Sequence, residues 1–348
     1  MVRRRCCVGV AAAAAVLIAV TVAPVACSSA SSGTTELESV RLGYFPNVTH
    51  APAILGVTEG YFQTELGEVR LATATFNAGT EAIEALFSGA IDMAFIGPNP
   101  AINAFARSDG EAVRIVAGTT SGGAALVVRA GIDDPGELTG CRLATPSLGN
   151  TQDVALRAWL VDRGYASSLE GGGEVSILPQ SNAQTLQTFL SGDIDGAWVP
   201  EPWASRLVLE GGGHVLVDES DLWPEGRFVT THLVVSTSFL QEHPDEVSAV
   251  LRGLIQAIDY AHENSEAAQA AVNGHIEELT GKALPSDVVS AAWGNLTFTL
   301  DPVAASLRTS ADNAVAVGLL EPVDLEGIYS LDLLNTILQQ EGREEVGE

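Results

Sequence analysis

The sequence has few basic residues and few cysteines, and these shortages exclude several classes of protein. Only 17 Lys and Arg residues stand against 44 Asp and Glu residues, and Lys282 is the single lysine. A nucleic-acid-binding surface needs clustered Lys and Arg to displace counterions from the phosphates, so the formal net charge of -27 argues against nucleic acid as a partner. Four cysteines in 348 residues also exclude a fold held together by disulfides.

Apolar residues, by contrast, are abundant. They make up 46% of the sequence, which excludes a disordered chain and supplies the core of a globular protein. The length of 348 residues favours two domains over one.

The first 26 residues have the pattern of an export signal. An arginine cluster at 3–5 precedes an unbroken apolar run at 8–23, which is shorter than the roughly 20 residues of a membrane-spanning helix. Cys27 then follows the small residue Ala26 and precedes a Ser-rich polar stretch. This arrangement resembles the lipobox of bacterial lipoproteins, except that Pro24 stands where Leu, Val or Ile is usual.

We therefore expect a signal peptide at 1–26, a lipidated Cys27 and a flexible tether at 27–39, with simple secretion or an uncleaved anchor as the alternatives. The lipid would hold the exported chain on the extracytoplasmic face of the cell membrane. Removal of 1–26 leaves 14 basic residues against 44 acidic ones, a net charge of -30. Cys141 would then be the only thiol without lipid, which excludes an internal disulfide and a metal site built on thiols.

Apolar runs and helical patterns alternate after the tether. The pattern predicts strands at 40–44, 73–77 and 91–96, with helices at 52–59 and 79–87. The same order returns from residue 141, with strands at 141–145, 175–178 and 194–199 and helices at 150–163 and 182–190. Such alternation is typical of α/β proteins with mainly parallel sheets.

The two halves also match in a short sequence alignment. Residues 88–96 (SGAIDMAFI) align without a gap on residues 191–199 (SGDIDGAWV), and five of the nine positions are identical. In each copy a glycine ends a helix, and the strand runs into a proline-rich turn at 97–100 or 200–203. Reuse of a common helix–glycine–strand joint is the alternative explanation, but the matching order of elements favours an internal repeat.

Two lobes need connecting strands, for which the apolar segments 123–129 and 231–236 are the candidates. The second lobe, 129–230, would then be inserted into a first lobe made of 40–128 and 231–348. The last part contributes C-terminal helices, one of which begins at His243-Pro244 and repeats apolar residues at helical spacing. Further helical patterns lie at 302–320 and 328–339.

Four segments carry a resemblance to a known family: 42–52 (LGYFPNVTHAP), 76–86 (FNAGTEAIEAL), 91–100 (IDMAFIGPNP) and 195–203 (DGAWVPEPW). Through them, residues 40–240 resemble the solute-binding proteins of ABC importers for nitrate, taurine and aliphatic sulfonates. The resemblance implies an α/β fold like that of periplasmic binding proteins, with two lobes, each a mainly parallel sheet flanked by helices, and two hinge strands. It also implies a monomer without cofactor or enzymatic activity, which captures a small molecule between its lobes and delivers it to a permease and its ATPase.

The candidate ligand-binding residues follow the strands, because parallel α/β sheets bind ligands beyond the carboxyl ends of their strands, near helix N-termini. The residues that meet this criterion are Asn47, His50, Asn77, Gly79, Thr80, Asn99, Thr120, Ser121, Asn150, Thr151, Glu201 and Trp203. Each has a structural alternative: asparagines cap turns and helices, His50 can be a structural hydrogen-bonding residue, and Glu201 can cap a helix rather than pair with a ligand ammonium.

No Lys or Arg lies in the loops that hold these candidates, so a bound sulfonate would be held by neutral amides, hydroxyls and helix ends. A zwitterion or a neutral solute, such as a thiamine precursor, would suit the same groups. An enzyme on the same scaffold is the alternative from another class of protein. The sequence, however, contains no Gly-x-Ser-x-Gly or His-Glu-x-x-His motif and no paired cysteines, and its six histidines are dispersed. A sensory lipoprotein that uses the same cleft is a third possibility.

Overall fold

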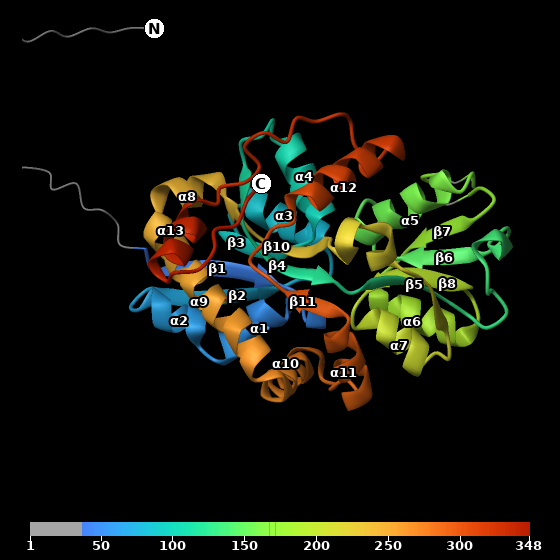
Figure 1. Ribbon diagram of the computed structural model, residues 1–348, viewed down its shortest axis with the longest axis horizontal. Coiled ribbons are helices and arrows are strands. Elements are labelled where there is room, and N and C mark those ends of the chain that lie inside the picture. Colours follow the sequence, from blue (N-terminus) through green and yellow to red (C-terminus); the bar gives the residue numbers. More distant parts are fainter. Residues whose placement is uncertain (1–36, 167, 171) are drawn as a thin grey trace, which may run out of the picture. The chain divides into compact units, whose positions relative to one another are not determined.

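The computed structural model describes residues 37–166, 168–170 and 172–348 (Figure 1). The predicted signal peptide and Cys27 lie outside the described residues. The first strand, β1, begins at Ser39, the last residue assigned to the tether. Within the described ranges, no helix combines the length and the apolarity needed to cross a membrane.

Two mixed sheets form the framework of the described chain. Strands follow one another in the order β11-β4-β10-β3-β1-β2 in the first sheet and β7-β6-β8-β5-β9 in the second. Their bounds are β1 Ser39–Tyr44, β2 Arg70–Thr75, β3 Met93–Ile96, β4 Val113–Gly122, β5 Ala124–Val128, β6 Arg142–Thr145, β7 Ser176–Pro179, β8 Gly196–Pro200, β9 His214–Asp218, β10 Val229–Ser236 and β11 Leu296–Phe298. We call each sheet with its helices a lobe, lobe 1 for the first sheet and lobe 2 for the second.

The sheets are mixed where the sequence predicts mainly parallel ones. β10 runs antiparallel to β3, and β5 runs antiparallel to β8, whereas β1 and β6 are parallel to both of their neighbours. The reason lies in the connections between lobes. β5 and β10 each come from the other lobe and join their sheet beside the carboxyl end of a neighbouring strand, so they run back along that strand. The pairs Ala124 with Pro200, at the end of β8, and His232 with Ile96, at the end of β3, show this.

The predicted internal repeat occupies equivalent places in the two lobes. β3 lies between parallel β1 and antiparallel β10, and β8 lies between parallel β6 and antiparallel β5. The aspartate that both copies share makes the same contact in each. Asp92 accepts the backbone N–H of Arg41 at 2.7 Å, Asp195 accepts that of Arg142 at 2.8 Å, and each carboxylate also pairs with the same arginine's side chain.

The first connection between lobes is very short. Only Gly123 separates β4 from β5, and Gly122 and Gly123 have φ angles of +80° and +71°, which side chains with a Cβ rarely adopt. The change of sheet therefore falls between Gly122 and Ala124, earlier than the boundary after residue 128 that the sequence suggests. The return reaches the first sheet at Val229, the start of β10. We propose lobe boundaries at these two places.

Helices cover both faces of each sheet. Figure 1 shows α5 on one side of the second sheet and α6 with α7 on the other. The helices are α1 Ala51–Thr58, α2 Tyr61–Leu66, α3 Gly79–Phe87, α4 Pro98–Arg107, α5 Thr151–Asp162, α6 Asn182–Ser191, α7 Trp203–Leu209, α8 Thr237–Glu242, α9 Pro244–Glu263, α10 Ser265–Thr280, α11 Ser286–Gly294, α12 Ala304–Ala316 and α13 Asp332–Gln340. Short 3-10 turns lie at Val48–His50, Pro135–Glu137, Glu219–Leu222 and Pro224–Gly226.

Two of these helices replace predicted turns. The proline-rich segment after β3 begins α4 with Pro98, and the segment after β8 leads directly into α7. Proline is tolerated in the first turn of a helix because the N–H that it lacks would have no helical partner there. The predicted helix at His243-Pro244 is confirmed as α9, whose buried face packs on α1 and α2 in the core of lobe 1.

Candidate functional site

The segments that follow the strands of both lobes meet around a small cavity, which we call the inner chamber. Its volume is about 50 Å³. Its lining comes from the segments after β1, β2 and β3 in lobe 1, from those after β6 and β7 and the last residue of β8 in lobe 2, and from β10. The lining residues are Phe45, Asn47, Thr49, His50, Asn77, Ala78, Gly79, Gly97, Pro100, Pro146, Asn150, Thr151, Gln152, Asn182, Pro200, Thr230 and Thr231.

Four helices begin at this chamber, two from each lobe. Gly79 and Gly97 stand at the starts of α3 and α4, and Thr151 and Asn182 are the first residues of α5 and α6. Each helix start carries unpaired N–H groups and roughly half a unit of positive charge. Among the described residues that line the chamber there is no Asp, Glu, Lys or Arg, although Glu81 and Asp153 stand in the first turns of α3 and α5. Such a site favours a compact group that carries negative charge on oxygen.

Asn47 and Asn150 reach the chamber from opposite lobes and already have partners. Asn150 caps α5, because its Oδ1 accepts the backbone N–H of Asp153 at 2.9 Å, and its Nδ2 donates to Gln152 Oε1 at 3.2 Å. Asn47 Oδ1 accepts a hydrogen bond from Trp203 Nε1 at 3.1 Å. Asn150 is thus fixed at both polar ends and Asn47 at its oxygen, which holds each amide in one orientation.

His50 is buried beside the chamber, at 3% exposure. Burial lowers its pKa to about 3, so the ring is neutral. The ring stacks on Phe45 at 4.4 Å between centroids, and its Nδ1 accepts the backbone N–H of Phe45 at 3.4 Å. In a neutral imidazole whose Nδ1 accepts, Nε2 carries the proton, so His50 is a neutral donor.

A larger cavity of about 600 Å³ adjoins the inner chamber, and we call it the outer chamber. The two share Phe45, Asn47, Asn77 and Asn182 in their linings. Its remaining lining residues are Pro46, Phe76, Glu81, Ser181, Ala183, Pro202, Trp203, Arg206, Ile276, Thr280, Lys282, Ala283 and Leu284. Aromatic rings therefore contribute to its walls from both lobes.

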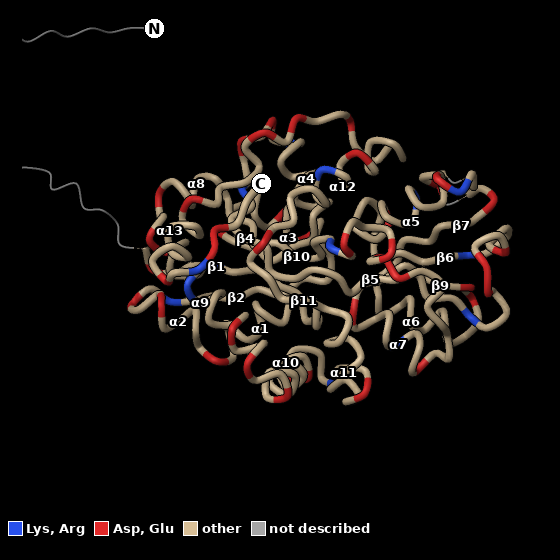
Figure 2. Tube along the Cα trace, in the orientation of Figure 1, with Lys and Arg blue, Asp and Glu red and all other residues tan. Residues whose placement is uncertain are grey.

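The charges around the outer chamber differ from those of the molecule as a whole. Acidic residues are spread over helices and loops around both sheets, and Lys and Arg are sparse (Figure 2). The outer chamber is lined by Lys282 and Arg206 against Glu81 alone. Arg206 stacks over the Trp203 ring at 4.7 Å from the centroid and pairs with Glu210 at 2.6 Å. Because Glu210 offsets Arg206, Lys282 and Glu81 are the remaining charged groups in the lining of the outer chamber, which is thus close to neutral in a strongly acidic molecule.

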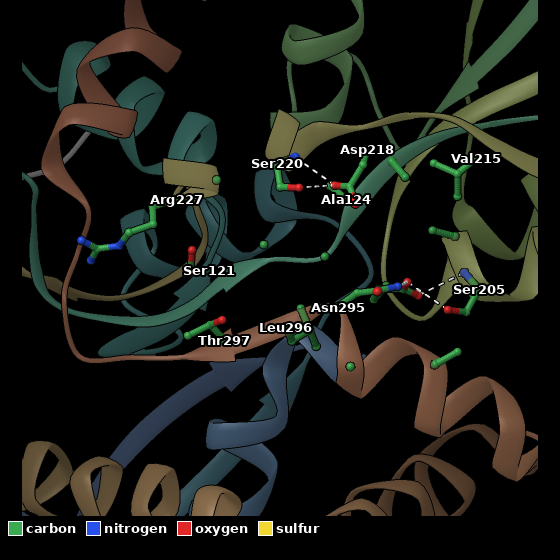
Figure 3. Close-up of a pocket in the computed structure, with 18 of the residues that line it drawn as sticks. Ser121, Ala124, Ser205, Val215, Asp218, Ser220, Arg227, Asn295, Leu296 and Thr297 are labelled. Carbon is green, nitrogen blue, oxygen red and sulfur yellow. Dashed lines mark hydrogen bonds between the residues drawn. The ribbon is translucent and has the colours of Figure 1, made fainter. Parts of the chain in front are cut away.

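A third cavity of about 760 Å³ lies beside the Gly122-Gly123 connection, and we call it the hinge cavity (Figure 3). Glu201 is buried at its wall, and burial raises the pKa of this carboxyl. Asn295 Nδ2 donates to Glu201 Oε1 at 2.8 Å, and the Ser205 hydroxyl donates to the same oxygen at 2.9 Å. Since Asn295 belongs to lobe 1, the Glu201 carboxylate forms a second hydrogen-bonded bridge between the lobes.

The structure divides the predicted site residues among these cavities. Asn47, His50, Asn77, Gly79, Asn150 and Thr151 line the inner chamber, and Trp203 lines the outer chamber. Ser121 and Glu201 line the hinge cavity instead. Each is held there by a hydrogen bond, Ser121 Oγ donating to the carbonyl of Phe228 at 2.7 Å.

Three further predicted residues line none of the three cavities, namely the inner chamber, the outer chamber and the hinge cavity. Thr80 is exposed on α3. Asn99 is buried with its Nδ2 donating to the carbonyl of Ser310 at 3.2 Å, which directs its amide toward α12. Thr120 Oγ1 donates to the carbonyl of Thr49 at 2.8 Å and so fastens β4 to the segment after β1. The Asn99 and Thr120 side chains are thus occupied by contacts within lobe 1.

Sequence reasoning also left out residues that line the inner chamber. Asn182, Phe45 and the hinge residues Thr230 and Thr231 are the main omissions. Asn182 starts a predicted helix directly after a predicted strand, so the strand-end rule would have found it.

A protein-family model described as the NMT1-like family matches residues 33–274. The chain belongs to this family. Among the family's relatives, the taurine-binding periplasmic protein of Escherichia coli (strain K12) is 28% identical over 210 residues, which cover 59% of this chain and 62% of the relative. The chain thus spans less than two thirds of that relative's length.

Two solved structures share the fold. The alkanesulfonate-binding protein SsuA from Xanthomonas axonopodis pv. citri, bound to MOPS, matches with a TM-score of 0.67 and 21% identity, over 82% of this chain and 95% of that one. The periplasmic nitrate-binding protein NrtA from Synechocystis PCC 6803 matches with a TM-score of 0.74 and 17% identity, over 88% and 89% of the chains. The predicted periplasmic-binding-protein fold is confirmed by these matches.

Proposed function

We propose that this protein is the solute-binding component of an ABC importer and that it holds a small oxyanion, such as a sulfonate, nitrate or taurine, between its lobes. One observation carries the proposal: two helix starts from each lobe meet at one chamber whose lining, among the described residues, contains no Asp, Glu, Lys or Arg. Fixed N–H groups stabilise negative charge on oxygen without a counter-ion of the protein. The names of the relatives, which bind taurine, alkanesulfonate and nitrate, support the same ligand class.

Binding by both lobes would stabilise the closed form, which a membrane permease and its ATPase would recognise. In this proposal Cys27 carries a lipid that keeps the exported monomer beside the permease. Lys282 lines the adjoining outer chamber and would lessen the repulsion that the acidic molecule exerts on an approaching anion there. The protein binds its solute and releases it unchanged, as a carrier rather than an enzyme.

Isothermal titration calorimetry of the full-length protein with taurine, ethanesulfonate, nitrate and bicarbonate tests the proposal. We expect at least one of these anions to bind at micromolar concentration and to raise the melting temperature with concentration. The recovered ligand should have an unchanged mass. The proposal fails if none of the four binds at millimolar concentration, or if the protein converts the ligand.

Two threonines provide a matched pair of variants. Thr151 lines the inner chamber at the start of α5, and Thr80 is exposed near the start of α3. Thr151→Val removes a hydroxyl from the chamber at nearly constant volume and should weaken binding by about fivefold to tenfold. Thr80→Val should leave the dissociation constant unchanged, and equal effects of the two variants would place the ligand elsewhere.

A further inference from the structure

Gly97 stands where lobe 1 touches lobe 2. It lines the inner chamber and directly precedes α4, which contacts α5 across the two lobes. A Cβ at this position would lie only 2.6 Å from Oγ1 of Thr151, the first residue of α5. Non-bonded carbon atoms pack at about 3.5–4.0 Å, and Thr151 is buried, so a side chain at position 97 has no room here.

The backbone of Gly97 does not itself require glycine. Its φ and ψ angles are -72° and 165°, extended values that any residue adopts. The internal repeat agrees with this. Gly97 follows the segment 88–96 as Pro200 follows the matching segment 191–199, and Pro200 carries a full side chain. The need for glycine at position 97 therefore comes from the other lobe.

Gly79, at the start of α3, is a different case. It also lines the inner chamber, but a Cβ there would lie 2.4 Å from Cγ of Pro100, which belongs to the same lobe. Separating the lobes would not relieve that overlap, so a side chain at 79 would disturb the packing of lobe 1 itself. A side chain at 97 would meet Thr151 only while the lobes are together.

We propose that the contact between Gly97 and Thr151 limits how far the lobes close, and that the missing side chain at 97 is what permits the form that holds the solute. This inference rests on the proposed function, in which the lobes separate to admit the solute. The two residues stand at helix starts of opposite lobes. A side chain at 97 would keep these helix starts apart and weaken their joint hold on an oxyanion.

Gly97→Ala tests the inference with the smallest side chain. Titration calorimetry of the full-length protein with taurine, ethanesulfonate, nitrate and bicarbonate gives the dissociation constants of the anions that bind. We expect each of these constants to be at least about tenfold higher for the variant than for the unmodified protein. Gly274→Ala, where a Cβ meets no atom of the rest of the described chain within 4 Å, is the control and should leave them unchanged.

The melting temperature without anion separates closure from folding. It should stay the same or rise in Gly97→Ala, because the open form has room for the methyl group and alanine has less backbone entropy to lose than glycine. A defect in the packing of lobe 1 would lower it instead, as Gly79→Ala should do.

Thr151→Ala separates a contact between lobes from a direct clash with the bound anion. This variant lacks the oxygen that a Cβ at 97 would meet. Adding Gly97→Ala to Thr151→Ala should therefore raise the dissociation constant by no more than about twofold, whereas a clash with the anion would cost the same in both backgrounds.

Three results would each overturn the inference: Gly97→Ala binds an anion as tightly as the unmodified protein, its loss of affinity persists in Thr151→Ala, or it lowers the melting temperature of the anion-free protein. Each of them would leave the proposed function standing. Binding of none of the four anions to the unmodified protein would overturn both.

Discussion

Trp203 Nε1 donates a hydrogen bond to Asn47 Oδ1 at 3.1 Å and joins the two lobes at the boundary between the inner and outer chambers. The bridge between Glu201 and Asn295, at 2.8 Å, joins the lobes at the hinge cavity. Both bridges start from the short segment after β8. This segment therefore fastens lobe 2 to lobe 1 at two separate cavities.

Removal of the first bridge should speed the release of ligand. Trp203→Phe keeps an aromatic wall but lacks the N–H, so the closed form loses one hydrogen bond between lobes. We expect the dissociation rate constant, measured by stopped-flow fluorescence, to rise by about threefold to tenfold. Trp293→Phe in α11 is the control, because this ring packs on Phe298 and lines none of the three cavities. Equal rates for both variants would contradict a closing role for Trp203.

Glu219 should make the protein less stable as the pH rises toward 7. This carboxyl is buried, accepts a hydrogen bond from Trp198 Nε1 at 2.7 Å and has its pKa raised from 4.5 to about 7 by burial. Between these two pH values the folded state keeps a proton that the unfolded state has lost, so stability falls as pH increases, by about 3 kcal/mol in all. Above pH 7 this loss stays constant.

Glu219→Gln should remove that loss, because the amide is neutral at every pH and still accepts the Trp198 N–H. Urea unfolding at pH 5 and pH 8 measures the difference between the two proteins. The variant should be more stable than the unmodified protein at pH 8 and nearly equal to it at pH 5. A constant difference at both pH values would contradict the assignment to Glu219.

Two buried histidines should have the opposite effect on the acid side. Burial lowers the pKa of His50 to about 3 and that of His232 to about 4, from 6.5. Below pH 6.5 the histidines of the unfolded state bind protons, whereas those of the folded state stay neutral. The free energy of unfolding therefore decreases as the pH falls from 6.5 toward these pKa values. His232→Gln should reduce the loss of melting temperature between pH 6.5 and pH 4. His262→Gln, at an exposed position, should leave it unchanged, and calorimetric scans at both pH values measure it.

Gly118 in β4 should not tolerate a side chain. A Cβ at this position would overlap the backbone carbonyl of Asp301, which cannot move aside as a flexible side chain can. Gly118→Ala should therefore destabilise the fold by several kcal/mol, as severe backbone clashes do. Gly274→Ala in α10 meets no atom within 4 Å and should stabilise by about 0.5–1 kcal/mol through helix propensity. Equal unfolding midpoints in urea would contradict the clash.

The sequence predicts a helix or strand well where a local residue pattern is enough to specify it. The helix predicted at 79–87 has the same bounds in the structure, as α3. The shared aspartates Asp92 and Asp195 make equivalent contacts in the two copies of the predicted repeat. The sheet to which β5 belongs could not be predicted, because an apolar strand buried on both faces reads the same in either sheet. Only its pairing with β8 and β9 decides this.

The candidate site shows a similar limit. The strand-end rule places Asn47, Asn77 and Asn150 near one another because it concerns the backbone. It cannot say where a side chain points. Asn99 stands in the first turn of α4 close to the chamber, yet its Nδ2 donates to the carbonyl of Ser310 in α12, 211 residues away in the sequence. Such a long-range partner leaves no local pattern.

The even division of the helix starts between the lobes has a consequence for unloading. If the four contribute equally, rotating the lobes apart leaves the solute with half of its favourable free energy. A dissociation constant of about 1 µM corresponds to about -8.2 kcal/mol, and half of that corresponds to about 1 mM. A transporter that separates the two lobes could therefore release the solute by that motion alone, with no proton transfer and no change in any side chain.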